Sequence, residues 1–313
     1  MKIDSKSPGH VAVQCDLPGC TNAMSFNVSI GLHNACGKFG WSKGISPWTV
    51  LCPEHKKEEV VAKPYRIALA YVDNRESFRK AFALSLMRVM LSFQSFANRM
   101  KTDEGVEYQL DLLPGEYGNV AEMREAVADS VIEGGYDAVM WMDSDMVFPD
   151  NTIENLLWTL NAYEEIDGVT GLYTYKKPPY MPHVYGKLDE KSGMFDIASS
   201  FPLDEPFFVE GAGFGCLLLR TKALERVPKP RFTMEFKGSR MVAGEDLTFC
   251  RNAKTKLILD PHVSCWHLGE SKISLEDYLK YNGIEKVDGR VAVTHEQRSA
   301  IMKAMPHLVS PKE

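Results

Sequence analysis

The sequence predicts an α/β protein, with a mixed sheet flanked by helices and preceded by a small cysteine-rich module. From residue 65 onward, apolar runs suited to buried strands alternate with segments of helical periodicity. Four of the seven cysteines fall within the first 52 residues. The length of 313 residues, with 44% hydrophobic and 25% charged residues, fits one large globular domain and one small one.

The N-terminal module carries two close pairs of metal-ligand residues, Cys15-x4-Cys20 and Cys52-x2-His55. Two tight pairs joined by a loop match the tetrahedral ligation of Zn²⁺, which would supply the folding energy of so short a segment. Apolar–polar alternation in MSFNVSI and the WTVL run before Cys52 predict short strands. We therefore expect residues 1–60 to form a zinc module held by these four side chains. The competing ligands are Cys36 and His33, and free thiols are the alternative.

The body of the chain follows a charged linker at residues 56–64. The compact apolar run 65–72 suits a buried parallel strand, and apolar residues then recur at helical spacing from Phe82. Segment 119–135 predicts a helix that is capped by Asn119 and ended by Gly134-Gly135. The other predicted strands are 108–114, 136–143, 167–175 and 257–269, and the other predicted helices are 150–160, 244–253 and two amphipathic segments after residue 273. Residues 65–313 are thus expected to form one domain around a parallel or mixed sheet.

Charge and hydropathy exclude several classes of function. Residues 1–64 carry seven lysines against five acids, whereas the remainder carries 29 basic and 37 acidic residues. An acidic body argues against a protein that coats nucleic acid, since such binding depends on neutralising phosphates. No stretch approaches the roughly 18 apolar residues of a membrane span, and the N-terminus lacks the apolar core of a secretory signal. We therefore expect a cytoplasmic protein with no membrane partner.

Two carboxylates, Asp143 and Asp145, lie at the carboxyl end of the apolar strand 136–143. The carboxyl ends of strands form the edge at which open α/β sheets bind ligands. Carboxylates one residue apart in an extended turn can meet one hard divalent cation together with diphosphate oxygens. The alternative is a solvated acidic turn, because Asp-x-Asp also occurs by chance.

Three later segments strengthen the case for a binding site. VEGAGFG at residues 209–215 leads into an apolar strand and suits close approach of the backbone to a ligand, although ordinary turn glycines give the same pattern. Glu245-Asp246 begin a predicted helix, and His267 follows the next strand. No GxGxxG follows the first strand, which argues against a dinucleotide-dependent dehydrogenase.

Taken in order, these motifs resemble the GT-A (Rossmann-like) fold of nucleotide-sugar glycosyltransferases, in particular the family-2-like group. The matching features are a helix with an arginine (AEMREA), Asp-x-Asp before FPDNTI, a glycine-bearing strand, a GED helix start and a C-terminal histidine. The first strand departs from the family pattern, since AYVDNRES replaces its usual turn. The CDLPGC and LCPEH segments are similar to the small zinc ribbons of bacterial and phage proteins.

The resemblance implies a metal-dependent glycosyltransferase whose donor is a nucleoside-diphosphate sugar. Asp145 and His267 would bind Mn²⁺ or Mg²⁺, with Asp143 at the ribose or at the metal through water. Asp246 would be the general base for the acceptor hydroxyl, with Glu245 beside it; acids that only cap the helix are the alternative. Further candidate donor contacts are Arg124, Tyr71, Gly213, Lys176 and Lys177, with solvated charges as the alternative for the basic ones. Weaker rivals of His267 are His183 and His262.

Two rival functions remain open. A nucleotidyltransferase also uses Asp-x-Asp on an α/β sheet, but it would want a glycine-rich phosphate loop after the first strand, and VDNRESFRK has no glycine. A zinc-ribbon adaptor with an inactive body would not need to retain all the site carboxylates. The ribbon favours a macromolecular acceptor, and the phage-type resemblance favours a virion protein or a hydroxymethylated base of phage DNA, modified in the host cytoplasm.

Overall fold

The computed structural model describes residues 63–73, 79–198, 200–269 and 272–304, together with the backbone of five short strands before residue 52. The chain divides into two compact units, one of Met1–Tyr65 with Ser95–Gln109 and the other of Arg66–Gln94 with Leu110–Glu313. In the first unit, β1 (Ile3–Asp4), β2 (His10–Gln14) and β3 (Ala23–Asn27) form an antiparallel sheet, and β4 (Ser42–Lys43) pairs with β5 (Val50–Leu51). The predicted zinc ligands, Cys15, Cys20, Cys52 and His55, and their rivals Cys36 and His33 lie outside the described residues.

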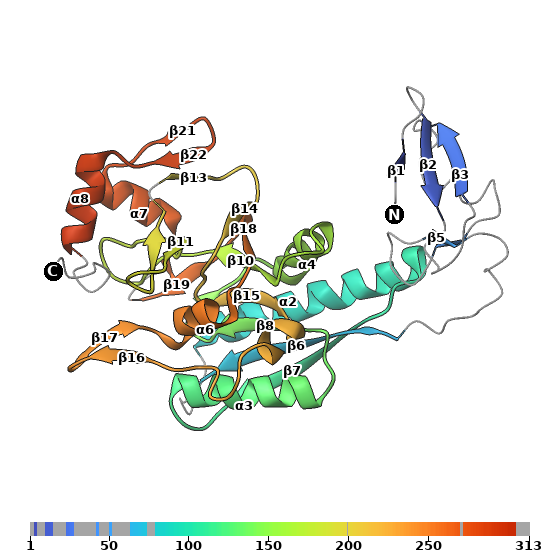
Figure 1. Cartoon of the computed structure of the whole chain (residues 1–313), viewed down its shortest axis with the longest axis horizontal. Helices are drawn as coiled ribbons and strands as arrows, with labels where there is room; N and C mark the ends of the chain where they lie inside the picture. The colour runs from blue at the N-terminus through green and yellow to red at the C-terminus, as the bar shows by residue number, and fades with distance from the viewer. Residues whose placement is uncertain are drawn as a thin grey trace. The chain divides into compact units, whose positions relative to one another are not determined.

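The second unit is built around a seven-stranded mixed sheet in the order β14-β18-β10-β15-β8-β6-β7, which confirms the predicted fold class (Figure 1). Its strands are β6 (Tyr65–Val72), β7 (Tyr108–Gly115), β8 (Ala138–Asp143), β10 (Gly168–Leu172), β14 (Phe207–Val209), β15 (Cys216–Arg220) and β18 (Leu257–Ser264). β6 runs parallel to β8 and β10 parallel to β18, whereas β15 is antiparallel to both β8 and β10. The carboxyl ends of β6, β8, β10 and β18 therefore share one edge of the sheet.

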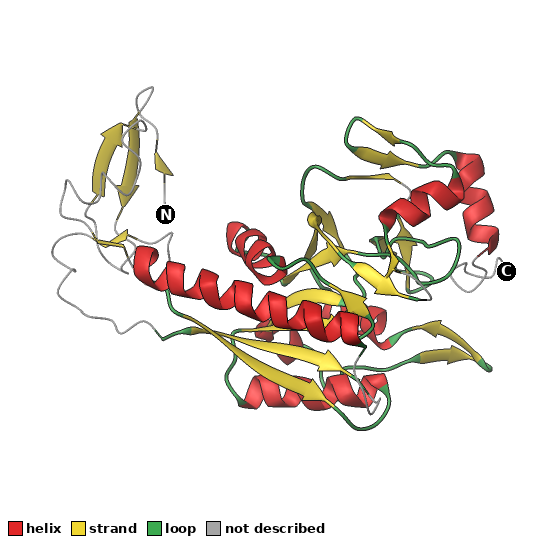
Figure 2. Ribbon diagram, turned by 180° about the vertical axis from the view of Figure 1, so that it is seen from behind, coloured by secondary structure: helices red, strands yellow, loops and turns green. Residues whose placement is uncertain are grey.

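Helices lie on both sides of the sheet because its central strands are apolar on both faces (Figure 2). They are α2 (Lys80–Arg99), α3 (Val120–Glu133), α4 (Thr152–Ala162), α5 (Thr221–Glu225) and α6 (Glu245–Ala253). On one face, Trp141 contacts the rings of Phe214 and Phe232 in a cluster that includes residues of α3 and α6. On the other face, the ring of Phe82 at the start of α2 lies edge-on to Tyr71 and Phe148.

Local capping explains where α3 begins, as the sequence predicted. The Asn119 side chain accepts hydrogen bonds from the backbone N–H groups of Ala121 and Glu122, and the Glu122 carboxylate accepts one from the Asn119 N–H. The helix ends at Gly134, and Gly135 takes a left-handed φ of 64° that glycine adopts without strain.

Short strands that the periodicity did not predict surround the sheet. Hairpins form from β11 (Tyr185–Asp189) with β12 (Met194–Ile197) and from β16 (Glu235–Lys237) with β17 (Arg240–Ala243). Two small sheets contain β13 (Ser200–Pro202) with β21 (Lys286–Val287) and β22 (Arg290–Ala292), and β9 (Met146–Val147) with β19 (Trp266–Leu268) and β20 (Lys272–Ile273). A π-helical turn, η3 (Met100–Glu104), follows α2. The two predicted tail helices are α7 (Leu275–Asn282) and α8 (His295–Ala304).

Among the described residues, none of the helices combines the length and the apolar character needed to cross a lipid bilayer.

Candidate active site

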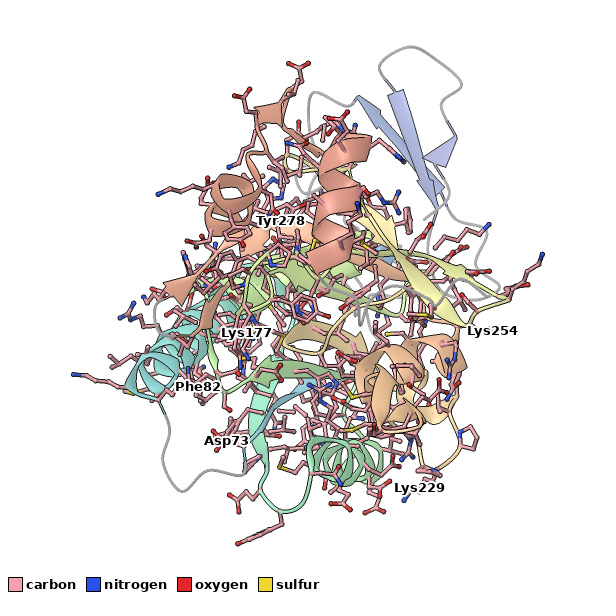
Figure 3. The ribbon with its side chains drawn as sticks, turned by 90° about the vertical axis from the view of Figure 1, so that its left-hand side faces the viewer. Asp73, Phe82, Lys177, Lys229, Lys254 and Tyr278 are labelled. Atoms are coloured by element: carbon pink, nitrogen blue, oxygen red, sulfur yellow. The ribbon has the colours of Figure 1, made fainter. Side chains whose placement is uncertain are left out.

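A cleft of about 460 Å³ opens at the sheet edge where β6 and β8 end. Figure 3 shows Asp73, the residue that follows β6, on the side of the molecule that also carries Lys177. Five carboxylates and three basic side chains line the cleft: Asp73, Asp143, Asp145, Glu245 and Asp246, with Arg79, Arg124 and Lys176. This excess of carboxylates favours a bound cation, above all when an anionic diphosphate is also to be held.

Arg124 of α3 is buried beneath the cleft and holds two of its acids. One terminal nitrogen lies 3.1 Å from Oδ1 of Asp143 and the other 2.9 Å from Oε1 of Glu245. Burial disfavours the guanidinium charge, but the adjacent carboxylates outweigh it and raise the pKa of Arg124. The structure therefore corrects the interpretation of Arg124 as a solvated helix charge. Both terminal nitrogens face carboxylates of the protein itself, and contact of Arg124 with a donor stays a prediction.

Asp145 is brought to His267 by strand pairing. β9 follows the Asp-x-Asp turn and pairs with β19, and the N–H of Leu268 donates to the Asp145 carbonyl at 2.7 Å. This places Nε2 of His267 3.5 Å from Oδ1 of Asp145, while the Lys176 ammonium contacts Oδ2. Burial opposes ionisation of Asp145, but hydrogen bonds from His267 and Lys176 prevail and hold its pKa well below the usual range.

The donor set at Asp145 fits a hard divalent cation. Nδ1 of His267 donates to the Thr174 carbonyl, which leaves Nε2, the ring nitrogen that faces Asp145, as the atom that would bind a cation. Two ligands that each lie about 2.1 Å from Mg²⁺ can be at most about 4.2 Å apart, and the observed 3.5 Å satisfies this limit. Within the described ranges, no group of three or more His, Cys, Asp or Glu side chains could hold a metal by itself. Asp145 and His267 would therefore be two protein ligands of such a cation.

Asp246 lies in the same cleft at the start of α6. Its Oδ1 accepts the N–H of Leu247 at 2.8 Å. Burial, followed by the charge of Glu245, raises the pKa of Asp246 to about 7, and Arg124 only partly offsets this rise. Glu245, in contrast, is engaged by Arg124. A carboxylate that changes protonation state near neutral pH suits general-base chemistry.

The glycine-rich turn lies against aromatic side chains. A Cβ on Gly213 would collide with Oη of Tyr173 and lie 3.0 Å from Nδ1 of His183 and 3.4 Å from Oδ2 of Asp246. His183 is stacked between Tyr173 and Tyr175, with ring centroids 4.4 and 4.1 Å away. The backbone of this turn thus lies close to the aromatic cluster, on the side that also holds Asp246, and its predicted approach to a ligand stays a prediction.

Other predicted site residues lie elsewhere. Tyr71 is buried with its ring against Phe82 and does not line the cleft, although the next two residues do. His262 pairs with Asp260 of its own strand, outside the cleft. The cysteines of the second unit, Cys216, Cys250 and Cys265, are buried and free, as expected of small apolar side chains.

Sequence reasoning missed Arg79. This residue lines the cleft and donates to the carbonyl of Leu268, next to His267. The sequence indicates it only by two arginines just after the first strand, at positions 75 and 79. That segment has no glycine and so does not match a glycine-rich phosphate loop.

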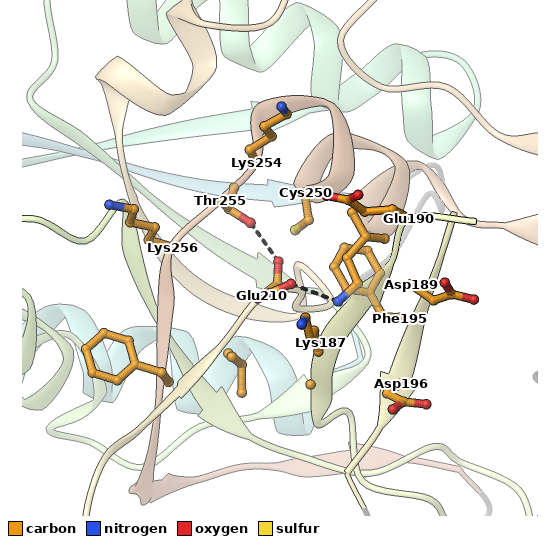
Figure 4. Close-up of a pocket in the computed structure, with 14 residues that line it drawn as sticks. Lys187, Asp189, Glu190, Phe195, Asp196, Glu210, Cys250, Lys254, Thr255 and Lys256 are labelled. Carbon is orange, nitrogen blue, oxygen red and sulfur yellow. Dashed lines mark hydrogen bonds between the residues drawn. The ribbon is translucent and has the colours of Figure 1, made fainter. Parts of the chain in front are cut away.

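A second cavity of about 1160 Å³ is lined by β11, β12, β14 and the segment after α6 (Figure 4). Glu210 stabilises its wall: the carboxylate accepts the Leu188 N–H at 2.8 Å, and the carbonyl accepts the Thr255 hydroxyl at 3.0 Å. Its charges are mixed, with Lys187, Lys254 and Lys256 beside four acids. None of the predicted site residues lines this cavity.

The comparisons with known proteins do not identify an activity for this chain. No protein-family model matches the sequence, and no curated protein matches it. A197 from STIV, a solved structure, is similar over 68% of this chain and 91% of its own, with 20% identity and a TM-score of 0.47. A Bacillus anthracis protein assigned as a glucose-1-phosphate thymidylyltransferase, in complex with a sucrose, is similar over 72% of this chain and 98% of its own, with 10% identity and a TM-score of 0.36. Likenesses of this degree carry no argument about activity.

Proposed function

We propose that this chain is a GT-A-type glycosyltransferase that moves a sugar from a nucleoside-diphosphate donor to a hydroxyl acceptor with the help of Mn²⁺ or Mg²⁺. One observation carries the proposal. One cleft is lined by Asp145, whose Oδ1 lies 3.5 Å from Nε2 of His267, and by a separate carboxylate, Asp246, whose pKa is raised to about 7.

The donor half of the cleft is the Asp-x-Asp turn. Asp145 and His267 would hold the divalent cation, which neutralises charge on the departing nucleoside diphosphate. Asp143 is fixed by Arg124 at the cleft wall, where its carboxylate can accept hydrogen bonds from ribose hydroxyls or from metal-bound water. Arg79 adds positive charge to the same side.

The acceptor half is the start of α6. Asp246 takes the proton of the acceptor hydroxyl as its oxygen attacks the anomeric carbon, and the sugar–phosphate bond breaks with its electron pair leaving on the diphosphate. A base with a pKa near 7 is both ionised to a useful extent and basic enough to accept this proton. Glu245 positions Arg124, since its carboxylate faces that guanidinium.

Hydrolysis of sugar nucleotides tests the proposal before the acceptor is known. UDP-, GDP- and dTDP-sugars are incubated with the protein in Mn²⁺ or in EDTA, and released nucleoside diphosphate is measured. We expect Mn²⁺-dependent release that falls by at least about tenfold in Asp145→Asn and His267→Ala. His262→Ala is the matched control, because His262 pairs with Asp260 outside the cleft. Equal release of nucleoside diphosphate in EDTA would show that the reaction does not depend on the metal.

The same assay separates the rival functions. A nucleotidyltransferase would release pyrophosphate from a nucleoside triphosphate in the presence of a sugar 1-phosphate, and an inactive adaptor would do neither reaction. For the acceptor we propose a macromolecule, either a protein or hydroxymethylated DNA, on the strength of the N-terminal zinc-ligand pattern. Transfer of a radiolabelled sugar to each of these two substrates identifies it.

A further inference from the structure

Lys176 forms an ion pair with the carboxylate of Asp145, the same carboxylate that would bind the cation. Its ammonium contacts Oδ2 of Asp145, whose other oxygen faces His267. Asp145 is about one-fifth exposed and Lys176 a little over one-third, so this ion pair is partly shielded from solvent at the wall of the cleft. The nearest described positive charge to Asp145 is therefore a flexible side chain that can move away.

The backbone that carries Lys176 is fixed, in contrast to its side chain. Thr174, two residues earlier, accepts the Nδ1–H of His267 and forms an antiparallel bridge with Pro182. The N–H of Tyr175 donates to the Met181 carbonyl at 2.8 Å. The segment that orients His267 thus also anchors Lys176, so that rotation of one long side chain is enough to free Asp145.

We propose that Lys176 is a resident counter-ion that the divalent cation displaces and that then pairs with the donor diphosphate. The proposal rests on the function proposed above. A doubly charged ion held by Asp145 and His267 prevails over a monovalent ammonium at the same carboxylate. The displaced ammonium stays on its anchored loop inside the cleft, where the diphosphate is the nearest new anion.

This model requires two opposite effects of removing the lysine. In Lys176→Met, Mn²⁺ alone should bind about three- to tenfold more tightly, because its competitor is gone. Pyrophosphate should bind the Mn²⁺-loaded variant about three- to tenfold more weakly, because the released ammonium is absent. A residue that only contacts phosphate would show the second effect alone, and a merely structural residue would show neither.

Both affinities are measured on the full chain, with free Mn²⁺ followed by electron paramagnetic resonance and pyrophosphate binding by calorimetry. Lys187→Met is the matched control, since Lys187 is an exposed lysine at the second cavity and forms no ion pair within the described part of the chain. Lys176→Arg should keep most of the pyrophosphate affinity. An Mn²⁺ affinity of Lys176→Met within twofold of wild type, or an equal change in Lys187→Met, would overturn the proposal.

Failure of this proposal is distinguishable from failure of the proposed function. Wild type could hydrolyse a sugar nucleotide equally well in EDTA and bind no Mn²⁺. Lys176 would then be the lasting positive charge at Asp145, so the proposed displacement of Lys176 would be wrong, whereas the proposed sugar transfer would stand. If no donor is hydrolysed but Lys176→Met still shows the two opposite shifts, displacement stands without the transferase.

Discussion

At the scale of single residues, the acids of the cleft differ in the charged groups that they face. Asp143 and Glu245 face Arg124, whereas Asp145 faces Lys176 and His267. Asp246 has its pKa raised to about 7, because burial and the charge of Glu245 outweigh the attraction of Arg124. One cleft thus holds two carboxylates, Asp145 and Asp246, whose pKa values are shifted in opposite directions.

Replacement of Asp246 by Asn should have opposite effects on activity and stability. We expect sugar transfer to fall by about 10²–10⁴-fold, with donor affinity nearly unchanged, and wild-type kcat/KM to rise with pH up to about 7.

The raised pKa of Asp246 in the folded protein means that wild-type stability declines as pH rises from about 4 to 7. Asp246→Asn should therefore be more stable than wild type at pH 8 by about 1–2 kcal/mol. Urea unfolding at pH 5 and pH 8 measures this gap, which should shrink at pH 5. Transfer at the wild-type rate would place the base elsewhere and favour a retaining mechanism.

His183 should make the protein sensitive to acid. Burial, followed by the charge of His267, lowers the pKa of His183 to about 3 in the folded protein, against about 6.5 when unfolded. The unfolded state therefore binds a proton first, and stability is lost as pH falls from about 6.5 toward 3. Between pH 7 and pH 5, wild type should lose about 2 kcal/mol more than His183→Phe, which keeps a flat ring between the tyrosines. Parallel urea titrations that show the same loss in both proteins would contradict this.

At the scale of elements, the site depends on pairings between short segments. β9 pairs with β19 and so brings His267 to Asp145, and the N–H of Asp143 donates to the Gly215 carbonyl at 3.0 Å. Gly215 in turn donates its N–H to Oη of Tyr173 at 3.1 Å. The glycine-rich turn thus contacts both the Asp-x-Asp turn and Tyr173, and it lies beside Asp246.

A methyl group at Gly213 should disturb this turn. In Gly213→Ala the new Cβ would collide with Tyr173, so we expect a loss of about 1–3 kcal/mol and slower donor hydrolysis. Gly186→Ala on β11 is the matched control: its nearest described atom lies 3.5 Å from the new Cβ, an ordinary contact, and its stability should change by less than about 0.5 kcal/mol. Chemical denaturation of the two variants compares them, and equal midpoints would show that the turn yields without cost.

At the scale of the whole molecule, we predict about one tightly bound Zn²⁺ per chain, held by Cys15, Cys20, Cys52 and His55. Elemental analysis of protein purified without added metal measures it. Cys20→Ser should lower the zinc content, whereas Cys250→Ser, at a buried free thiol of the second unit, should leave it unchanged. A loss of zinc in Cys36→Ser with full content in Cys20→Ser would move the ligand set to Cys36.

The long elements were predictable because their signals are local. The apolar run of β6, the spacing of Phe82 and later residues in α2, and the Asn119 cap of α3 each lie within one segment. The β11 and β16 hairpins were missed since their strands, YGKLD and EFK, are too short and too polar to show a period of two. Those strands form because each pairs with the next strand of its hairpin, β12 or β17, in the folded chain.

The sequence by itself determined the order of the long strands and helices and most of the chemical inventory of the site: Asp143, Asp145, Asp246 and His267 all stand at or near the ends of predicted elements. Only the tertiary structure decided how these groups are paired. It buried Arg124 between two acids and set Lys176 against Asp145, across separations of 19 to 121 residues. It also raised the pKa of Asp246. The physical reason is that an ionisable group takes its properties from burial and from charges a few ångströms away, and these neighbours come from distant segments that only packing brings together.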